Sequence, residues 1–146
     1  LLGPLGVENR TAISKTQMEN WVKEGVVQYL GETDCVGAFI EKASCVVLPS
    51  YREGTSRVLL EAAAMGRPII TTNVTGCREI VDHGVNGFLC KLKSPLDLEK
   101  KMIDMAVLSQ KEREEMGGKG RQKVENEFDQ EIVCQIYIDA IQELGI

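Results

Sequence analysis

Two glutamates, Glu53 and Glu61, form an E-x7-E pattern across a polar loop and the helix expected after it. The spacing alone is weak evidence, because glutamates eight positions apart occur by chance in most proteins. Their placement says more: Glu53 lies in a strand-to-helix loop, and Glu61 is the only charge between Val58 and Met65. A buried carboxylate is costly unless it is paired or faces a polar cleft. We therefore expect both carboxylates near the carboxyl end of the preceding strand, where open α/β sheets bind ligands.

Simpler interpretations of the two glutamates stay open at this point. Glu61 can pair with Arg57, four residues earlier on the same helix, and Glu53 can be a solvated loop charge. The Arg-before-Glu order is the poorer orientation, and such pairs contribute only about 0.2–0.5 kcal/mol. So weak a pair does not account for a carboxylate on so apolar a helix, and we favour a ligand site.

The residues Gly54, Thr55 and Ser56 begin the same helix. Free N–H groups and the positive end of the helix dipole suit a phosphate there. Two or three charge-assisted hydrogen bonds, each worth roughly 1.5–3 kcal/mol, would hold a diphosphate without a metal. The alternative is ordinary capping by Thr55 or Ser56. A second loop, at Thr75 and Gly76, follows another strand and is a candidate to line the same cleft.

The order of apolar runs and amphipathic segments predicts a parallel sheet with crossover helices. The expected strands are 1–5, 26–30, 45–48, 68–72 and 88–90, with 45–48 the most buried. The expected helices are 14–23 with Ser14 as N-cap, 35–43, one that ends at Gly66, 77–81, 96–109, 111–128 and 130–144. The pair Gly117-Gly118 is expected to mark a weak point or a cap in the helix 111–128.

We interpret residues 1–146 as one domain of Rossmann-like α/β class that is cut from a longer protein. The first residues are already an apolar strand, and the strand order normally needs another βα unit before Leu1. The last helix, 130–144, would return towards a domain that precedes this one.

The composition excludes several classes of protein. Hydrophobic content of 43% and charged content of 27% are ordinary for a globular chain. The net charge of −5 and the scattered basic residues argue against a nucleic-acid surface. No apolar run reaches about 18 residues, so we expect no membrane-spanning helix. We also expect no signal peptide, because the first residues lack a charged segment followed by an apolar core and a small-residue cleavage site. The cysteines are odd in number, scattered and without CxxC spacing, so we expect free thiols and a reducing cytoplasm; they are Cys35, Cys45, Cys77, Cys90 and Cys134. One histidine, His83, cannot complete a metal site with cysteines so dispersed.

Several short motifs stand in a recognisable order: 29–31, 47–50, 53–55 with Glu61, 64–70, 76–81 and 84–89. Together they resemble the C-terminal, donor-binding domain of a GT-B glycosyltransferase of the large retaining family 4. Within that family, the chain is similar to bacterial enzymes that build capsule, O-antigen or lipid-linked oligosaccharides. The motifs span about half of the chain, and their combination is highly specific.

The resemblance implies a role for each candidate site residue. Glu53, the residue assigned to catalysis, would accept hydrogen bonds from the hydroxyls of the donor sugar, and Glu61 from those of the ribose. The other donor-binding residues would offer amides to the sugar and diphosphate or border the base: Gly54, Thr55, Ser56, Gly76, Tyr29, Leu30 and Gly31.

The resemblance also implies the reaction and the partners. A nucleotide-diphosphate sugar, UDP-sugar favoured, would be transferred with retention to a saccharide or lipid-linked acceptor. The resemblance implies a reaction without a metal, and the absence of a DxD motif fits that expectation. The basic pair that neutralises the diphosphate and the acceptor domain would lie before Leu1, so the isolated chain is expected to be inactive. A carrier-lipid acceptor would bring the enzyme to the inner face of the cytoplasmic membrane.

Other functions remain open on the sequence alone. A nucleotide-binding or interaction module without catalysis would keep the same fold. A GT-B-like sugar-nucleotide epimerase is a further possibility, although such enzymes lack the E-x7-E arrangement. An NAD-binding domain is disfavoured because no G-x-G-x-x-G follows a strand.

Overall fold

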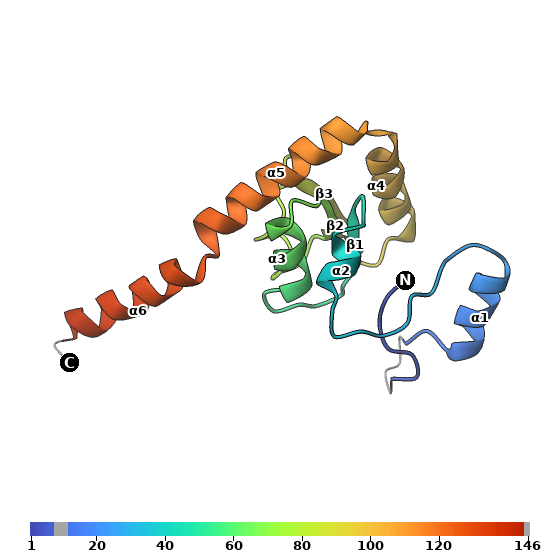
Figure 1. Cartoon of the computed structure of the whole chain (residues 1–146), viewed down its shortest axis with the longest axis horizontal. Coiled ribbons are helices and arrows are strands. Elements are labelled where there is room, and N and C mark those ends of the chain that lie inside the picture. Colours follow the sequence, from blue (N-terminus) through green and yellow to red (C-terminus); the bar gives the residue numbers. More distant parts are fainter. Residues whose placement is uncertain (8–11, 145–146) are drawn as a thin grey trace. The chain divides into compact units, whose positions relative to one another are not determined.

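The computed structural model describes residues 1–7 and 12–144. The chain forms two compact units, one up to Val36 and one from Gly37 onward. In the second unit, β1 (Val46–Leu48), β2 (Ile69–Thr72) and β3 (Gly87–Cys90) form a parallel sheet in the order β1-β2-β3 (Figure 1). The predicted class, a parallel α/β sheet flanked by helices, is confirmed. The assignment of residues 1–146 to one domain stays a prediction.

The first unit contains helix α1 (Lys15–Lys23), which begins where it was predicted to begin. The hydroxyl of Ser14 accepts a hydrogen bond from the N–H of Gln17 at 3.2 Å, as an N-cap residue does. Met18 is the buried residue of this helix, at 3% exposure.

The strands predicted at 1–5 and 26–30 do not form in the first unit. The two segments are nevertheless joined, since the N–H of Leu30 donates to the carbonyl of Leu1 at 2.8 Å. Gly3 then turns the chain with a φ of 141°. A few backbone hydrogen bonds between two such short segments do not form a regular β-ladder, and for this reason the predicted strands are absent from the first unit.

β2 is the buried centre of the sheet, not the strand at 45–48. All four residues of β2 are buried, whereas Val47 of β1 is 38% exposed. The sequence-based prediction was wrong because β1 is an edge strand of this sheet, with β2 on one side only. Thr71 can be buried within β2 because its hydroxyl donates to the carbonyl of Leu48 at 2.8 Å.

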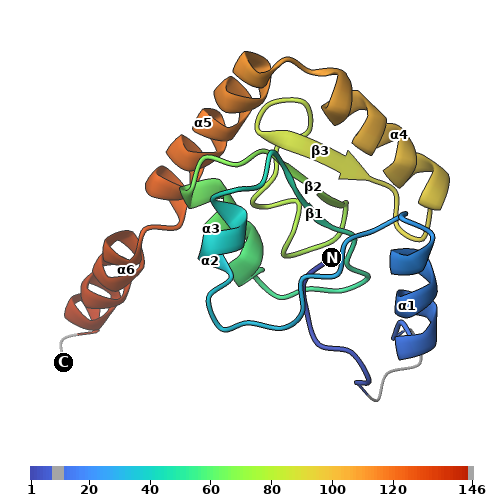
Figure 2. The ribbon, with the colours of Figure 1, turned by 45° about the vertical axis from the view of Figure 1, so that its right-hand side comes forward.

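Helices lie on both sides of the sheet in the second unit. The helices of this unit are α2 (Gly37–Ile40), α3 (Arg57–Ala64), α4 (Pro95–Val107), α5 (Gln110–Glu127) and α6 (Gln130–Glu143). α3 packs on β1, β2 and α5, and α4 packs on β3 and β2 (Figure 2). α6 extends beyond α5, away from the sheet (Figure 1). Within the described residues, none of the helices is both long enough and apolar enough to cross a membrane.

The last three predicted helices agree with α4, α5 and α6 to within a residue or two, and α3 ends just before Gly66 as predicted. The helix predicted at 35–43 is shorter, because only the single turn α2 forms. The helix predicted at 77–81 is instead a pair of turns, in which the N–H groups of Cys77 and Arg78 both donate to the carbonyl of Val74.

Helix α5 runs without interruption through Gly117 and Gly118, so the predicted weak point or cap is wrong. Gly117 instead lets the end of α3 approach closely. A Cβ atom on Gly117 would lie 1.9 Å from the carbonyl oxygen of Gly66. Gly66 itself has a φ of +65°, the left-handed conformation that commonly ends a helix.

All five thiols are free, as predicted. Cys77 and Cys90 are buried, whereas Cys134 is exposed although it stands in an apolar run. The reason is that α6, which carries it, extends away from the sheet (Figure 1). Burial raises the pKa of the Cys45 thiol to about 12. Such a thiol stays protonated at neutral pH and behaves as a small hydrophobic group.

Candidate functional site

The carboxyl ends of the three strands surround a cavity of about 330 Å³. Its walls come from the loops after β1 and β3, the last residues of β2 and β3 and the start of α4, and they include Pro49, Tyr51, Thr72, Cys90 and Lys93. This is the edge at which open α/β sheets bind ligands, as the sequence predicted. The two glutamates of the E-x7-E pattern are not among the residues that line this cavity.

Tyr51 and Lys93 form one wall of the cavity, and sequence reasoning missed both. The Lys93 ammonium lies 5.7 Å from the centroid of the Tyr51 ring, within the range of a cation–π interaction. Lys93 has a φ of 55°, which is unusual for a residue with a side chain. The only sequence signal was that both residues closely follow predicted strands.

Glu53 is half-buried in the loop after β1. Its Oε1 accepts a hydrogen bond from the Ser50 hydroxyl at 2.5 Å. Because Ser50 belongs to the same loop, this contact fixes the carboxylate close to the carboxyl end of β1. Glu53 is therefore an anchored acceptor rather than a freely solvated charge.

Glu61 is less buried than the apolar character of its helix suggested. Its side chain is 44% exposed, and its Oε1 lies 3.8 Å from Nη2 of Arg57, whose side chain is 90% exposed. The intrahelical pair left open by the sequence is thus present in the structure. An exposed pair of this kind contributes little, about 0.3–0.5 kcal/mol, so a ligand that binds the carboxylate can displace the arginine at small cost.

The start of α3 presents backbone donors. Ser56 is buried at the N-cap, but its hydroxyl forms no capping bond to the described part of α3. Capping by Ser56, one of the two alternatives for this segment, is therefore not observed. The exposed residues Gly54 and Thr55 have N–H groups that meet no hydrogen-bond acceptor among the described residues. These two amides stand beside the helix start, where an anion is favoured.

The loop after β2 lies directly against the loop after β1. A Cβ atom on Gly76, whose φ is +84°, would lie 1.6 Å from the carbonyl oxygen of Gly54. The N–H of Ser56 donates to the carbonyl of Gly76 at 3.4 Å. The structure thus brings Gly76 together with Gly54, Thr55 and Ser56, which sequence reasoning left open.

Glu79 is a further residue that sequence reasoning missed. Its Oε2 accepts a hydrogen bond from the N–H of Gly76 at 2.5 Å, and its Oε1 lies 3.4 Å from Nε of Arg78. The pKa of Glu79 is lowered mainly by its own backbone N–H, then by Gly76 and Arg78. The signal in the sequence was the spacing of three residues, at which a glutamate side chain can reach back to a backbone N–H.

The other predicted site residues, Tyr29, Leu30 and Gly31, belong to the first unit. There the Tyr29 hydroxyl donates to the carbonyl of Gly3 at 2.8 Å, and Leu30 is 41% exposed. Their place beside a nucleotide base stays a prediction.

Comparisons with known proteins agree with this fold and show the family. Residues 5–107 match the family described as glycosyl transferases group 1. The capsular polysaccharide biosynthesis glycosyltransferase CapM of Staphylococcus aureus is 35% identical over 98 residues, which are 67% of this chain and 26% of that protein. The N,N'-diacetylbacillosaminyl-diphospho-undecaprenol alpha-1,3-N-acetylgalactosaminyltransferase of Campylobacter jejuni is 30% identical over 118 residues, 81% of this chain and 31% of that protein.

Among solved structures, Anabaena Alr3699/HepE in complex with UDP superposes with a TM-score of 0.77 at 22% identity, covering 88% of this chain and 35% of that one. At this identity the likeness shows a shared fold. The chain spans about a quarter to a third of the length of these relatives. Because the family match covers more than half of the chain, the protein belongs to the group 1 glycosyl transferases, with the fold of a GT-B C-terminal domain.

Proposed function

We propose that this chain binds the nucleotide-diphosphate sugar of a retaining glycosyltransferase, with a UDP-sugar as donor. The observation that carries the proposal is the pair of open amides of Gly54 and Thr55, at the carboxyl edge of the sheet beside the anchored carboxylate of Glu53. Amides at a helix start suit the diphosphate, and a carboxylate suits sugar hydroxyls. The UDP bound to the Anabaena protein supports the choice of nucleotide.

The chain's own residues would act on the departing nucleotide diphosphate. Negative charge develops on the diphosphate as the glycosidic bond to it breaks, and the amides of Gly54 and Thr55 are placed to stabilise that charge. One such preorganised donor is typically worth about 2.7–4 kcal/mol. Glu53 would hold the donor sugar by its hydroxyls, and Glu61 would hold the ribose, which requires it to release Arg57.

The rest of the reaction would depend on parts outside this chain. We propose an acceptor domain and a basic pair for the diphosphate elsewhere in the enzyme, and we expect no turnover by the 146-residue chain alone. The relatives' roles in capsule synthesis and on an undecaprenol-linked substrate support a saccharide or carrier-lipid acceptor at the inner face of the cytoplasmic membrane. No metal is required by this proposal.

Calorimetry with UDP, GDP and UDP-sugars, each with and without EDTA, tests the proposal. We expect saturable UDP binding that EDTA leaves unchanged, and about tenfold weaker binding by Glu61→Ala, since a charge-assisted hydrogen bond is worth roughly 1.5–3 kcal/mol. The matched control is Glu115→Ala, because the Lys111–Glu115 pair on α5 has the same 3.8 Å separation and is also exposed. Absence of UDP binding, or equal losses in both variants, would contradict the assignment.

Glu53 is tested in the complete enzyme by Glu53→Gln. Transfer should fall much more than nucleotide affinity, because Glu53 is assigned to the sugar and not to the nucleotide. If turnover fell no further than affinity, the proposed role of Glu53 would be wrong. UDP binding by a complete protein without any transfer would instead favour the non-catalytic module, and an altered sugar in the released nucleotide would favour an epimerase.

A further inference from the structure

We propose that Glu79 is a positioning residue: through Gly76 it holds the Gly54–Ser56 loop in the orientation that turns an amide toward the ligand. This inference rests on the proposed function of that loop. Glu79 itself is assigned no contact with substrate.

The first step is the contact between Gly76 and Gly54. The Gly54 carbonyl oxygen and carbon would lie 1.6 Å and 2.5 Å from a Cβ on Gly76, so the carbonyl occupies the place of a side chain. In a planar trans peptide the carbonyl and the next N–H point in opposite directions. Because the Gly54 carbonyl faces Gly76, the N–H of Thr55 faces away from Gly76, toward the open side of the loop.

The second step is the bond that fixes Gly76. The N–H of Gly76 donates to Oε2 of Glu79 at 2.5 Å, while the carbonyl of Gly76 accepts the N–H of Ser56 at 3.4 Å. One residue thus connects the Glu79 carboxylate to the start of α3. A rotation of the Gly76 peptides would break the Ser56 bond and release the Gly54 carbonyl.

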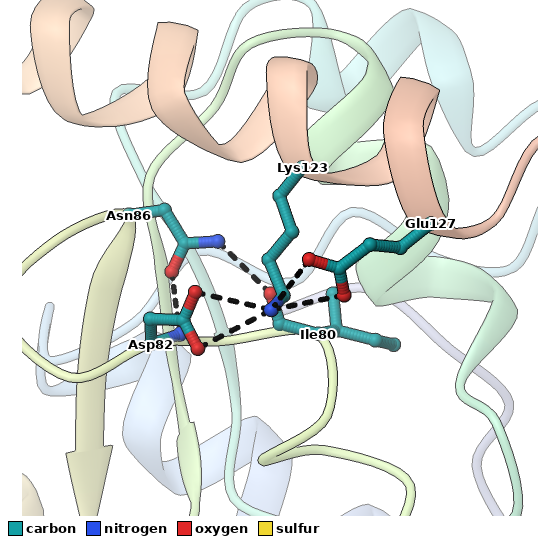
Figure 3. Close-up of polar contacts among 5 residues, drawn as sticks. All are labelled: Ile80, Asp82, Asn86, Lys123 and Glu127. Carbon is teal, nitrogen blue, oxygen red and sulfur yellow. Dashed lines mark hydrogen bonds and ion pairs between the residues drawn. The ribbon is translucent and has the colours of Figure 1, made fainter.

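The third step is that the far end of the Glu79 segment is firmly held. Ile80 is fully buried, and its carbonyl accepts a hydrogen bond from the side chain of Asn86 at 2.9 Å (Figure 3). Asn86 also accepts the N–H of Asp82 at 2.7 Å. Lys123 of α5 then joins Asp82 and Glu127, each at 3.1 Å (Figure 3). Because residues 80–86 are held against α5 in this way, the Glu79 carboxylate acts only on the opposite end of the loop, at Gly76.

The side chain of Glu79 is 46% exposed, which separates its positioning role from a general role in stability. Its removal opens no core cavity and strands no buried charge. A loss of UDP affinity would therefore come from the orientation of Gly76 and of the loop that Gly76 contacts, because the removal of one negative charge by itself favours an anion.

The test compares Glu79→Ala and Glu79→Gln with the control Glu112→Ala in the 146-residue chain. Glu112 makes the same kind of bond to a backbone N–H, to Ser109 at 2.7 Å, at the start of α5. We expect UDP affinity to fall about tenfold in Glu79→Ala, from the loss of a charge-assisted bond, and to recover to within about threefold of wild type in Glu79→Gln, which keeps an acceptor oxygen. Glu112→Ala should bind UDP like the wild type.

A second measurement works without any ligand. In the amide ¹H–¹⁵N spectrum, the signals of Gly54, Thr55 and Ser56 should shift in Glu79→Ala and stay in place in Glu112→Ala. If these signals did not move, or if Glu79→Ala bound UDP with the affinity of the wild type, the inference about Glu79 would be overturned. The proposed function would still stand in that case, provided that the wild-type chain binds UDP. If the signals shifted but the wild-type chain bound no UDP, the positioning role of Glu79 would be supported and the proposed ligand of the loop would be refuted.

Discussion

Replacing Gly117 by alanine tests the crossing of α3 and α5, because the structure leaves no room for a side chain there. The new Cβ would lie 1.9 Å from the Gly66 carbonyl oxygen and 2.6 Å from its carbon. Both obstacles are backbone atoms, so no rotamer change can relieve the clash and the two helices must separate. Overpacking typically costs about 1–3 kcal/mol, against a gain of about 1 kcal/mol from replacing a helical glycine. With backbone in the way we expect a net loss of about 2 kcal/mol.

Gly118 provides the matched control one position along the same helix. A Cβ on Gly118 would meet no described heavy atom within 4 Å. Gly118→Ala therefore keeps the gain in helix propensity without the clash, and it should stabilise the chain by about 0.5–1 kcal/mol. The two glycines have nearly the same local helical context. Changes in unfolding free energy of opposite sign would therefore come from the contact between α3 and α5.

The assay is urea and thermal unfolding of the 146-residue chain, followed by circular dichroism. At about 2–4 °C per kcal/mol for a chain of this size, Gly117→Ala should lower Tm by roughly 4–8 °C, and Gly118→Ala should raise it slightly. If both variants were stabilised alike, α5 would not press on Gly66 as described and the account of the crossing would be refuted.

The other predictions concern the buried side-chain amide of Asn86 and the half-buried thiol of Cys45. Asn86→Ala leaves the buried carbonyl of Ile80 and the part-buried N–H of Asp82 without their partner. At about 1–3 kcal/mol for the buried carbonyl, we expect a loss of about 1–3 kcal/mol in urea unfolding, and a loss well below about 1 kcal/mol would contradict this. The Cys45 thiol has a pKa raised from 9.0 to about 12, so its contribution to stability is complete below pH 9 and is lost as the pH rises toward 12. Cys45→Ala should flatten the alkaline decline in unfolding free energy, and an unchanged slope would speak against burial of this thiol.

Elements with a strong local pattern could be predicted from the sequence. The serine that begins α1, the β-branched run of β2 and the Ser and Asp N-caps of α4 to α6 are signals that lie within a few residues of the element they specify. The family and its parallel fold followed from the order of short motifs, since those motifs reflect loops that parallel strands require. The sequence also predicted the position of Glu53 and of the start of α3 just after a strand, because a polar loop after an apolar strand is a local feature.

Properties that depend on neighbours distant in the sequence were decided only by the tertiary structure. The exposure of β1 follows from its place at the sheet edge, and the exposure of Glu61 from the face of α3 that packs on the sheet. Gly117 looked like a helix break because its partner, Gly66, lies far away in the sequence. The contact of Gly76 with Gly54 likewise joins loops after two different strands. Such contacts depend on how elements meet in space, and the residue types at either end do not encode which partner each will find.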